Sequence, residues 1–395
     1  MKSKITLILI LFSSLIYFCF SCSPQPDDSS QFSSSAGRGA VYNGLYYSFT
    51  NNTISYIDCE IDISPISLCA DTLCTHNDTS CPAYFPDYGK RLMVIDPSAS
   101  NRNAEFPIFY ISCCFGDDNK IVRFNAKTNQ STVLVSSIPN VIQSLWIYDD
   151  LLYYTSFEND GQLNIQAYDM SADTTYKLDN TNKLRYYIGG IDDLHIYFTD
   201  YDGNVYRAPH DLSSTEYICN SVTCGKVYIS DNDIFFLSNI HVGSVVEDTN
   251  FLACDLLSIP KNDINASPEI VLENISYISV PIIFKYHNTF FYCVCDNVSA
   301  QRSLEKFDSR ENTTSTIQMF DDGTSSIYIY DLESKQTTPM IENSDYNLGM
   351  FFAANDQFFV YSGFPYALDE ITEHGINTSI IIFDYNAKKQ YTYDN

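Results

Sequence analysis

Pairs of adjacent aromatic residues recur along this chain between turn formers, and this unevenly spaced repeat restricts the fold more than any other sequence feature. In the middle of the chain the pairs are spaced by about 44 residues, and a turn-forming Asp or Asn precedes most of them by a few positions. Seven of these pairs give the register of the repeat, namely Tyr46-Tyr47, Phe109-Tyr110, Tyr153-Tyr154, Tyr197-Phe198, Phe235-Phe236, Phe290-Phe291 and Phe358-Phe359.

The clearest copy of the repeat is residues Ile147–Asp169, which has the pattern of a β-hairpin. An acidic turn at Asp149-Asp150 precedes a strand with the pair Tyr153-Tyr154, a loop ending in Asp160-Gly161 reverses the chain, and Asn164–Tyr168 alternates polar and apolar residues. Such alternation between Asp, Asn and Gly is typical of half-buried antiparallel strands. The other copies also have return strands, at Ile121–Phe124, Asn204–Arg207 and Ile380–Phe383.

These repeats predict an all-β chain that folds as a β-propeller of about seven blades, with six to eight as the alternatives. The intervals are longer near both ends of the chain, which predicts insertions at Thr53–Phe85 and near Ser299–Ile341. The second insertion contains two strand candidates, Leu304–Phe307 and Ile327–Tyr330, that would suit an eighth blade.

Ring closure is expected to protect the edge strands from aggregation. We expect the N-terminal segment around Ala40–Tyr42 to pair within the last blade, or the C-terminal strand Gln390–Tyr393 to pair within the first. In either case one blade would contain strands from both ends of the chain.

Composition agrees with an all-β fold, because 31 Tyr and 26 Phe suit a pleated surface and polar turn formers fill the intervals. The formal net charge of −27 excludes nucleic acid as a partner, because no basic stripe is present to contact a phosphate backbone. We interpret the acidity as a source of solubility, and attraction of cations or basic partners is the alternative.

The N-terminus has the layout of an export signal, with two lysines, an apolar stretch from Ile5 to Phe20, and Ser21 before Cys22. It resembles a bacterial lipoprotein signal, and this resemblance implies lipidation of Cys22, which would anchor the exported protein to the extracytoplasmic face of a cell membrane. Cys19 and Phe20 depart from the usual pattern, so an uncleaved anchor and ordinary signal cleavage are the alternatives.

The chain is thus expected to contain three parts. Residues 1–21 form the signal peptide, residues 22–39 form a flexible tether rich in Ser and Pro, and residues 40–395 form the propeller with a Cys/His-rich insertion at 59–86. We expect the propeller to be a monomer.

The strongest local motif lies in the first insertion, where Cys69, Cys74, His76 and Cys81 occur within a short segment. Three thiols and one imidazole are the ligand set of a closed, structural zinc site with no open position for catalysis. The spacing Cys-x4-Cys-x-His-x4-Cys is not a common zinc-finger pattern. A disulfide between Cys74 and Cys81 and a set of reduced thiols are therefore the alternatives.

The leader, this motif and the Tyr-rich repeats together resemble a group of uncharacterised bacterial propeller lipoproteins with TolB-like repeats. In that group the motif usually contains Asp-Pro-Leu-Cys, whereas this chain has Thr72 between Asp71 and Leu73. The resemblance implies a propeller fold and a membrane location, and it implies no activity.

The remaining cysteines are expected to be small core or edge residues, with a disulfide between Cys219 and Cys224 as the exception. The chain contains no nucleophile elbow, phosphate loop, dinucleotide fingerprint or His-Glu-x-x-His motif. We therefore expect a binding or scaffold module that contacts a protein, peptide or glycan through propeller loops, without a cofactor other than the structural zinc. The alternative is an extracytoplasmic enzyme, for example one that acts on glycans, with carboxylates in the channel.

Overall fold

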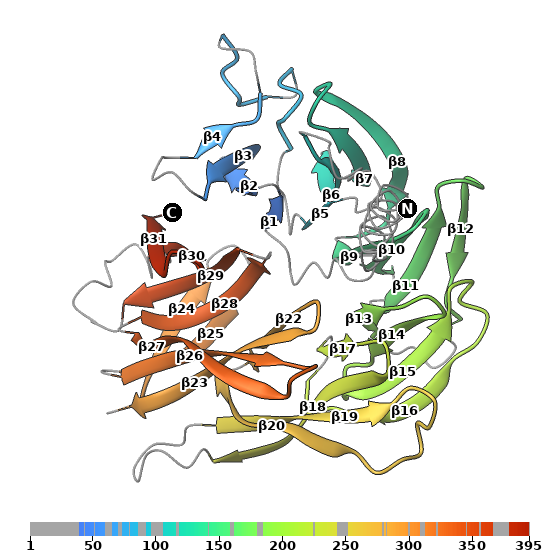
Figure 1. Ribbon diagram of the computed structural model, residues 1–395. Helices are drawn as coiled ribbons and strands as arrows, with labels where there is room; N and C mark the ends of the chain where they lie inside the picture. Colours follow the sequence, from blue (N-terminus) through green and yellow to red (C-terminus); the bar gives the residue numbers. More distant parts are fainter. Residues whose placement is uncertain are drawn as a thin grey trace, which may run out of the picture.

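The computed structural model of the protein is a ring of seven antiparallel sheets, which are the blades of an all-β propeller (Figure 1). Each blade has its first strand at the centre of the ring and its last strand at the rim. The predicted fold class is confirmed, and the described residues contain no helix. The structure describes residues 39–42, 44–50, 52–59, 65–69, 73–78, 80–85, 92–95, 106–115, 118–140, 142–158, 162–179, 185–223, 226–242, 252–278, 280–281, 283–298, 301–308, 313–320, 323–344, 346–354, 357–365 and 379–394.

The first four blades each contain four strands, which follow one another from the centre of the ring to its rim. Blade one contains β1 (Gly39–Tyr42), β2 (Leu45–Thr50), β3 (Thr53–Asp58) and β4 (Ile66–Ser67). Blade two contains β5 (Leu92–Ile95), β6 (Ile108–Phe115), β7 (Asp118–Asn125) and β8 (Gln130–Ile138). Blade three contains β9 (Ile142–Tyr148), β10 (Leu151–Phe157), β11 (Leu163–Asp169) and β12 (Thr174–Lys177). Blade four contains β13 (Tyr187–Ile191), β14 (His195–Thr199), β15 (Asn204–Pro209) and β16 (Glu216–Asn220).

The last three blades follow the same order with additions. Blade five contains β17 (Val227–Ile229), β18 (Asp233–Val242), β19 (Leu252–Pro260), β20 (Glu269–Ile278) and a short fifth strand, β21 (Val280–Pro281). Blade six contains β22 (Ile283–Tyr286), β23 (Thr289–Val298), β26 (Gly323–Asp331) and β27 (Gln336–Ser344), and a separate hairpin of β24 (Gln301–Asp308) and β25 (Thr313–Phe320) is inserted between β23 and β26. Blade seven contains β28 (Tyr346–Ala354), β29 (Phe358–Pro365), β30 (Ser379–Asp384) and β31 (Lys389–Asp394).

Every aromatic pair of the sequence repeat lies in the second strand of a blade, and all of these side chains are buried. Because adjacent residues of a strand point to opposite faces, each pair supplies one ring to each of the two neighbouring blade interfaces. Phe291 of blade six thus stacks on Phe359 of blade seven, with ring centroids 4.6 Å apart. Seven hydrophobic clusters fill the seven interfaces in this way.

The ring closes by side-chain packing between blades one and seven. β1 pairs with β2 of its own blade, and β31 pairs with β30 of its own blade, so the expected strand exchange between the two ends of the chain is wrong. Instead, Tyr46 and Val41 of blade one pack against Phe358 and Ile382 of blade seven in one buried cluster. The aromatic pairs at both ends supply enough apolar surface to join these blades without a shared sheet.

The insertion near Ser299–Ile341 does not form an eighth blade. Leu304–Phe307 lies in β24 of the inserted hairpin, whereas Ile327–Tyr330 lies in β26, which is the third strand of blade six. Periodicity alone could not distinguish these two strands, because both alternate and both follow turn residues.

A recurring turn joins the third and fourth strands of several blades. The side-chain oxygen of Asn125 or Asp169 accepts backbone N–H bonds from the residues two and three positions later. The fourth residue after each of them, Asn129 or Asp173, has φ of 52°, which closes the turn in the left-handed region. Asp331 and Asp384 begin equivalent turns that end at Lys335 and Lys388.

Because strand direction alternates, the strands that flank residues 68–91, 299–322 and 366–378 all end and begin at one end of the ring. We call this the insertion end, and it is the end at which the second strand of each blade finishes. Cys22 and the predicted signal and tether, up to residue 38, lie outside the described residues. Within the part of the chain that the structure describes, no helix has the length and hydrophobicity needed to cross a bilayer.

Candidate metal centre

The four predicted ligands lie in the connection between β4 and β5, which is tied to the start of β3 by backbone hydrogen bonds. The amide of Leu68 donates to the carbonyl of Ile54 at 2.9 Å, and the amide of Ile54 donates to the carbonyl of Ala83 at 3.0 Å. The Thr53 hydroxyl also donates to the carbonyl of His76 at 3.0 Å. The connection therefore leaves blade one and returns to the same place, which brings its two ends together.

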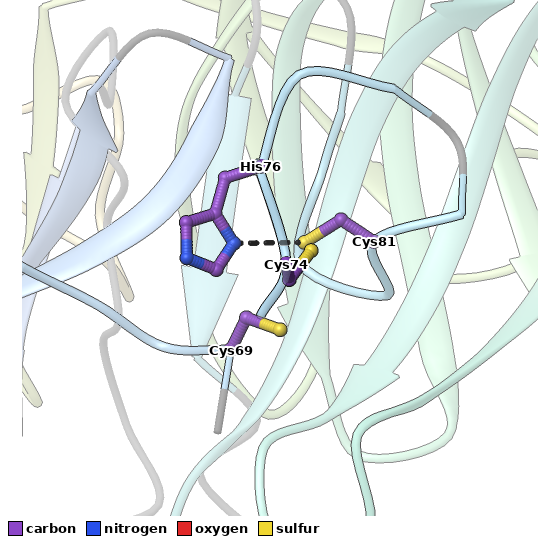
Figure 2. A group of neighbouring side chains, drawn as sticks. All are labelled: Cys69, Cys74, His76 and Cys81. Atoms are coloured by element: carbon purple, nitrogen blue, oxygen red, sulfur yellow. Dashed lines mark hydrogen bonds between the residues drawn. The ribbon is translucent and has the colours of Figure 1, made fainter. Parts of the chain in front are cut away.

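The side chains of Cys69, Cys74, His76 and Cys81 converge, as Figure 2 shows, and their ligand atoms all lie within 4.8 Å of one another. Nδ1 of His76 lies 3.5 Å from Sγ of Cys81. In a tetrahedral zinc site, bond lengths of about 2.3 Å to sulfur and about 2.05 Å to nitrogen place these two atoms about 3.6 Å apart. The residues present thus have the donor types of a zinc site, and the distance between His76 and Cys81 matches its geometry.

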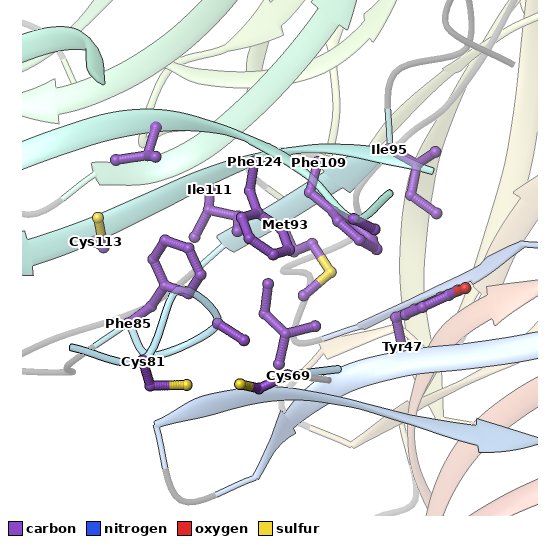
Figure 3. Packing of buried hydrophobic residues seen from close by; sticks show 14 residues of the cluster. Tyr47, Cys69, Cys81, Phe85, Met93, Ile95, Phe109, Ile111, Cys113 and Phe124 are labelled. Atoms are coloured by element: carbon purple, nitrogen blue, oxygen red, sulfur yellow. The ribbon is translucent and has the colours of Figure 1, made fainter. Parts of the chain in front are cut away.

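Two of the four candidate ligands, Cys69 and Cys81, lie in the interface between blades one and two. Cys81 is 2% exposed and Cys69 is 9% exposed, and both belong to the hydrophobic cluster that contains Tyr47, Phe109 and Phe124 (Figure 3). A metal bound here would join the connection to the packed core of two blades.

Local turns hold the last ligand in place. The carboxylate of Asp78 accepts a hydrogen bond from the amide of Ser80 at 2.8 Å, and the carbonyl of Asp78 accepts one from the amide of Cys81 at 3.1 Å. Hydrogen bonds from Ser80 lower the pKa of Asp78. His76 has φ of 55°, a conformation that costs energy for a residue other than glycine and is often found at functional sites.

The electrostatics of the cluster disfavour the thiolate form unless a cation is bound. Burial, together with the neighbouring thiols of Cys74 and Cys69, raises the pKa of Cys81 to about 12, although a backbone hydrogen bond from Ala83 acts in the opposite direction. Three thiolates this close together would repel one another in a partly desolvated place. A divalent ion removes that penalty, because it binds the thiolate form and compensates its charge.

The structure also adds a residue that the sequence motif does not contain. A hollow of about 420 Å³ is bordered by Cys69 and Cys74 and also by Asn129, which belongs to the β7–β8 turn of blade two. Sequence patterns could not connect Asn129 to these cysteines, because it belongs to another repeat and its turn resembles those of other blades.

The second predicted cysteine pair is described only in part. Cys219 lies in β16 as a thiol whose pKa is raised to about 12 by burial, whereas Cys224 lies outside the described residues. A disulfide between them stays a prediction.

A second hollow, of about 470 Å³, lies between blades five and six and is bordered by the carboxylates of Asp231, Asp233, Glu269 and Glu333. Burial and the charge of Glu269 raise the pKa of Asp233, while the ammonium of Lys335 opposes this shift. These carboxylates thus lie at the interface between blades five and six, near the end of the ring opposite the insertion end. The enzyme alternative expected carboxylates in the central channel instead.

Comparison with known proteins identifies the fold and no family. No protein-family model matches the sequence, and no curated protein matches it. Among solved structures, the chain is similar to a prolyl endopeptidase, with a TM-score of 0.50 and 11% identity over 93% of this chain and 50% of that chain. It is also similar to the tricorn protease, with a TM-score of 0.43 and 10% identity over 90% of this chain and 44% of that chain.

A putative TolB from Agrobacterium tumefaciens is similar as well, with a TM-score of 0.36 and 16% identity over 58% of this chain and 77% of that chain. The chain spans about half the length of the prolyl endopeptidase and less than half of the tricorn protease. At these identities the likeness concerns the fold alone.

Proposed function

We propose that this protein is a monomeric binding or scaffold module, tethered by a lipid on Cys22 to the extracytoplasmic face of a cell membrane. In this proposal the loops at the insertion end bind a protein, peptide or glycan. The leader and the Cys22 position support the location, and the propeller fold supports a binding role, because propellers present loops from rigid blades.

The observation that carries the binding role is the unequal distribution of connections between the two ends of the ring. The connections 68–91, 299–322 and 366–378 all leave from the insertion end, whereas at the other end only the connection 96–107, between β5 and β6, approaches this length. Large apolar side chains are exposed there too. Leu73 is 91% exposed in the first of these connections, and Tyr201 is 67% exposed in the β14–β15 turn.

We infer that zinc holds the first connection in a fixed shape. Cys69, Cys74, His76 and Cys81 would bind the ion through three thiolates and Nδ1 of the imidazole, and the ion would have a structural role because four protein ligands complete a tetrahedral site. Fixing the connection before binding lowers the entropy cost of ordering it against a partner. The exposed Leu73 side chain would thereby be presented from a rigid support.

Site-specific photo-cross-linking in cells tests the binding surface. A photoreactive residue in place of Leu73 or Tyr201 should form adducts with a partner, whereas the same residue in place of Leu194, which is 70% exposed in the β13–β14 turn at the opposite end, should not. Adducts at position 194 alone, or at none of the three positions, would contradict the proposal. Metabolic labelling with a radioactive fatty acid tests the tether, because the wild type should incorporate the label and Cys22→Ala should not.

A further inference from the structure

We propose that Asn129 of blade two belongs to the metal centre, where its side-chain amide donates an N–H···S hydrogen bond to a zinc-bound thiolate. This inference rests on the zinc centre proposed above and extends it across a blade interface. Asn129 would be a positioning residue, since it acts on the ligands and does not contact the ion.

The placement of Asn129 is the first argument. It borders the hollow of about 420 Å³ that Cys69 and Cys74 also border. The two cysteines belong to the connection after blade one, whereas Asn129 belongs to the β7–β8 turn of blade two. The hollow is therefore a place where an amide from one blade can reach the sulfur ligands of the other.

The hydrogen bonding of Asn129 is the second argument. Its Oδ1 is buried and has no hydrogen-bond partner among the described residues. A buried acceptor without a partner costs about 1–3 kcal/mol, and an amide oxygen beside thiolates would also be repelled by their charge. Rotation of the amide by half a turn exchanges Oδ1 for the Nδ2 donor. In the loaded site Nδ2 would then donate to a zinc-bound thiolate, which accepts such hydrogen bonds.

The turn itself does not require asparagine at this position. Asn129 has φ of 52°, and the same left-handed position is occupied by Asp173 in blade three, Lys335 in blade six and Lys388 in blade seven. Since aspartate and lysine occupy this position in the equivalent turns, the turn does not need an amide at position 129.

The experiment measures zinc affinity by chelator competition in the full chain and in three variants. Asn129→Gly removes the donor and suits the positive φ, Asn129→Asp keeps the shape without a donor, and Asp173→Gly is the matched control in the same turn position of blade three. We expect Asn129→Gly to weaken zinc binding by about ten-fold or more. Asn129→Asp should weaken it further, because it adds a negative charge, and Asp173→Gly should bind as the wild type does.

A spectroscopic readout separates the hydrogen bond from a general structural effect. In the cobalt-substituted protein, loss of an N–H···S bond destabilises the thiolate electrons and should shift the sulfur-to-metal charge-transfer band to longer wavelength in both Asn129 variants. Wild-type protein that binds zinc with the same affinity and the same band as both variants would overturn this inference while leaving the zinc centre intact. Wild-type protein that binds neither zinc nor cobalt would overturn both proposals.

Discussion

The hydroxyl of Tyr153 in blade three lies 2.6 Å from Nδ1 of His210 in blade four, and this contact joins the two blades near the end opposite the insertions. Tyr148 stacks on the same imidazole with ring centroids 5.1 Å apart. Tyr153 is fully buried, and Nε2 of His210 is buried without a partner among the described residues. Within the described part of the chain, the Tyr153 hydroxyl is thus the hydrogen-bond partner of this histidine ring.

Tyr153→Phe should therefore lower the free energy of unfolding by about 1–2 kcal/mol, because it leaves the His210 ring unpaired in a buried place. Tyr176→Phe is the control, since Tyr176 is 37% exposed on the outer strand β12 and its change should stay within about 0.5 kcal/mol. Urea unfolding of both variants measures the difference. Equal stability of the two variants would show that the contact does not hold the blades together.

Two glycines with positive φ should respond differently to the same change. Gly203 has φ of 85°, and a Cβ there would lie 2.1 Å from the carbonyl oxygen of Ser221, whereas Gly44 has φ of 75° with open space around it. We expect Gly44→Ala to cost about 1 kcal/mol from backbone strain alone. Gly203→Ala should cost at least about 2 kcal/mol more, since the backbone of blade four must also move. Thermal and urea unfolding of the two variants measures the loss of stability. An equal loss for Gly44→Ala and Gly203→Ala would refute this prediction.

The buried lysine of blade six predicts a pH dependence of stability. Lys285 in β22 is 6% exposed, and its ammonium donates a hydrogen bond to the carbonyl of His287. Burial lowers the pKa of Lys285 to about 7, against the opposing charge of Asp231 and with a smaller contribution from Lys261. Between pH 7 and about 10 the unfolded chain therefore holds a proton that the folded chain releases.

Stability should consequently rise with pH in this range, by up to about 1 kcal/mol per pH unit from this group. Lys285→Met should remove that rise, and the two proteins should differ most at pH 7, where the charged form is most penalised. Urea unfolding at pH 7, 8 and 9 measures how the free energy of unfolding changes with pH in each protein. The contributions of other titrating groups, such as the cysteines, are the same in both proteins and cancel in the comparison. Parallel slopes would contradict the account of Lys285.

Much of the fold could be predicted because each blade repeats the same physical requirement. A second strand buried on both faces needs two adjacent large side chains, so a pair such as Tyr153-Tyr154 lies in the second strand of each of the seven blades. The prediction of strand exchange at ring closure was wrong, because Tyr46 and Phe358 close the ring by side-chain packing. No local sequence pattern reveals such packing.

The candidate site could be predicted only as far as its ligands are close in sequence. Cys69, Cys74, His76 and Cys81 follow one another in one connection, and the structure brings their ligand atoms together. Asn129 could not be found, because its proximity depends on how blade two packs against blade one. Residues that meet only across a blade interface have no characteristic separation in the sequence, so no motif can reveal them.

The metal centre should also stabilise the propeller, because Cys81 and Cys69 belong to the core between blades one and two. Removal of zinc by a chelator, or the substitution His76→Ala, should lower Tm, since binding to the folded state alone shifts the unfolding equilibrium. Cys219→Ser is the matched control, because this thiol lies in β16 away from the cluster and should leave zinc content unchanged. A chelator without effect on Tm would argue against a structural ion.

X-ray absorption at the zinc edge, with zinc content and free thiols counted on the same sample, tests the central claim most directly. The account predicts one zinc per chain with three sulfur ligands at about 2.3 Å and one nitrogen at about 2.0 Å, and it predicts that His76→Ala loses the nitrogen or the ion. A protein that contains no zinc and has Cys74 joined to Cys81 in a disulfide would contradict it.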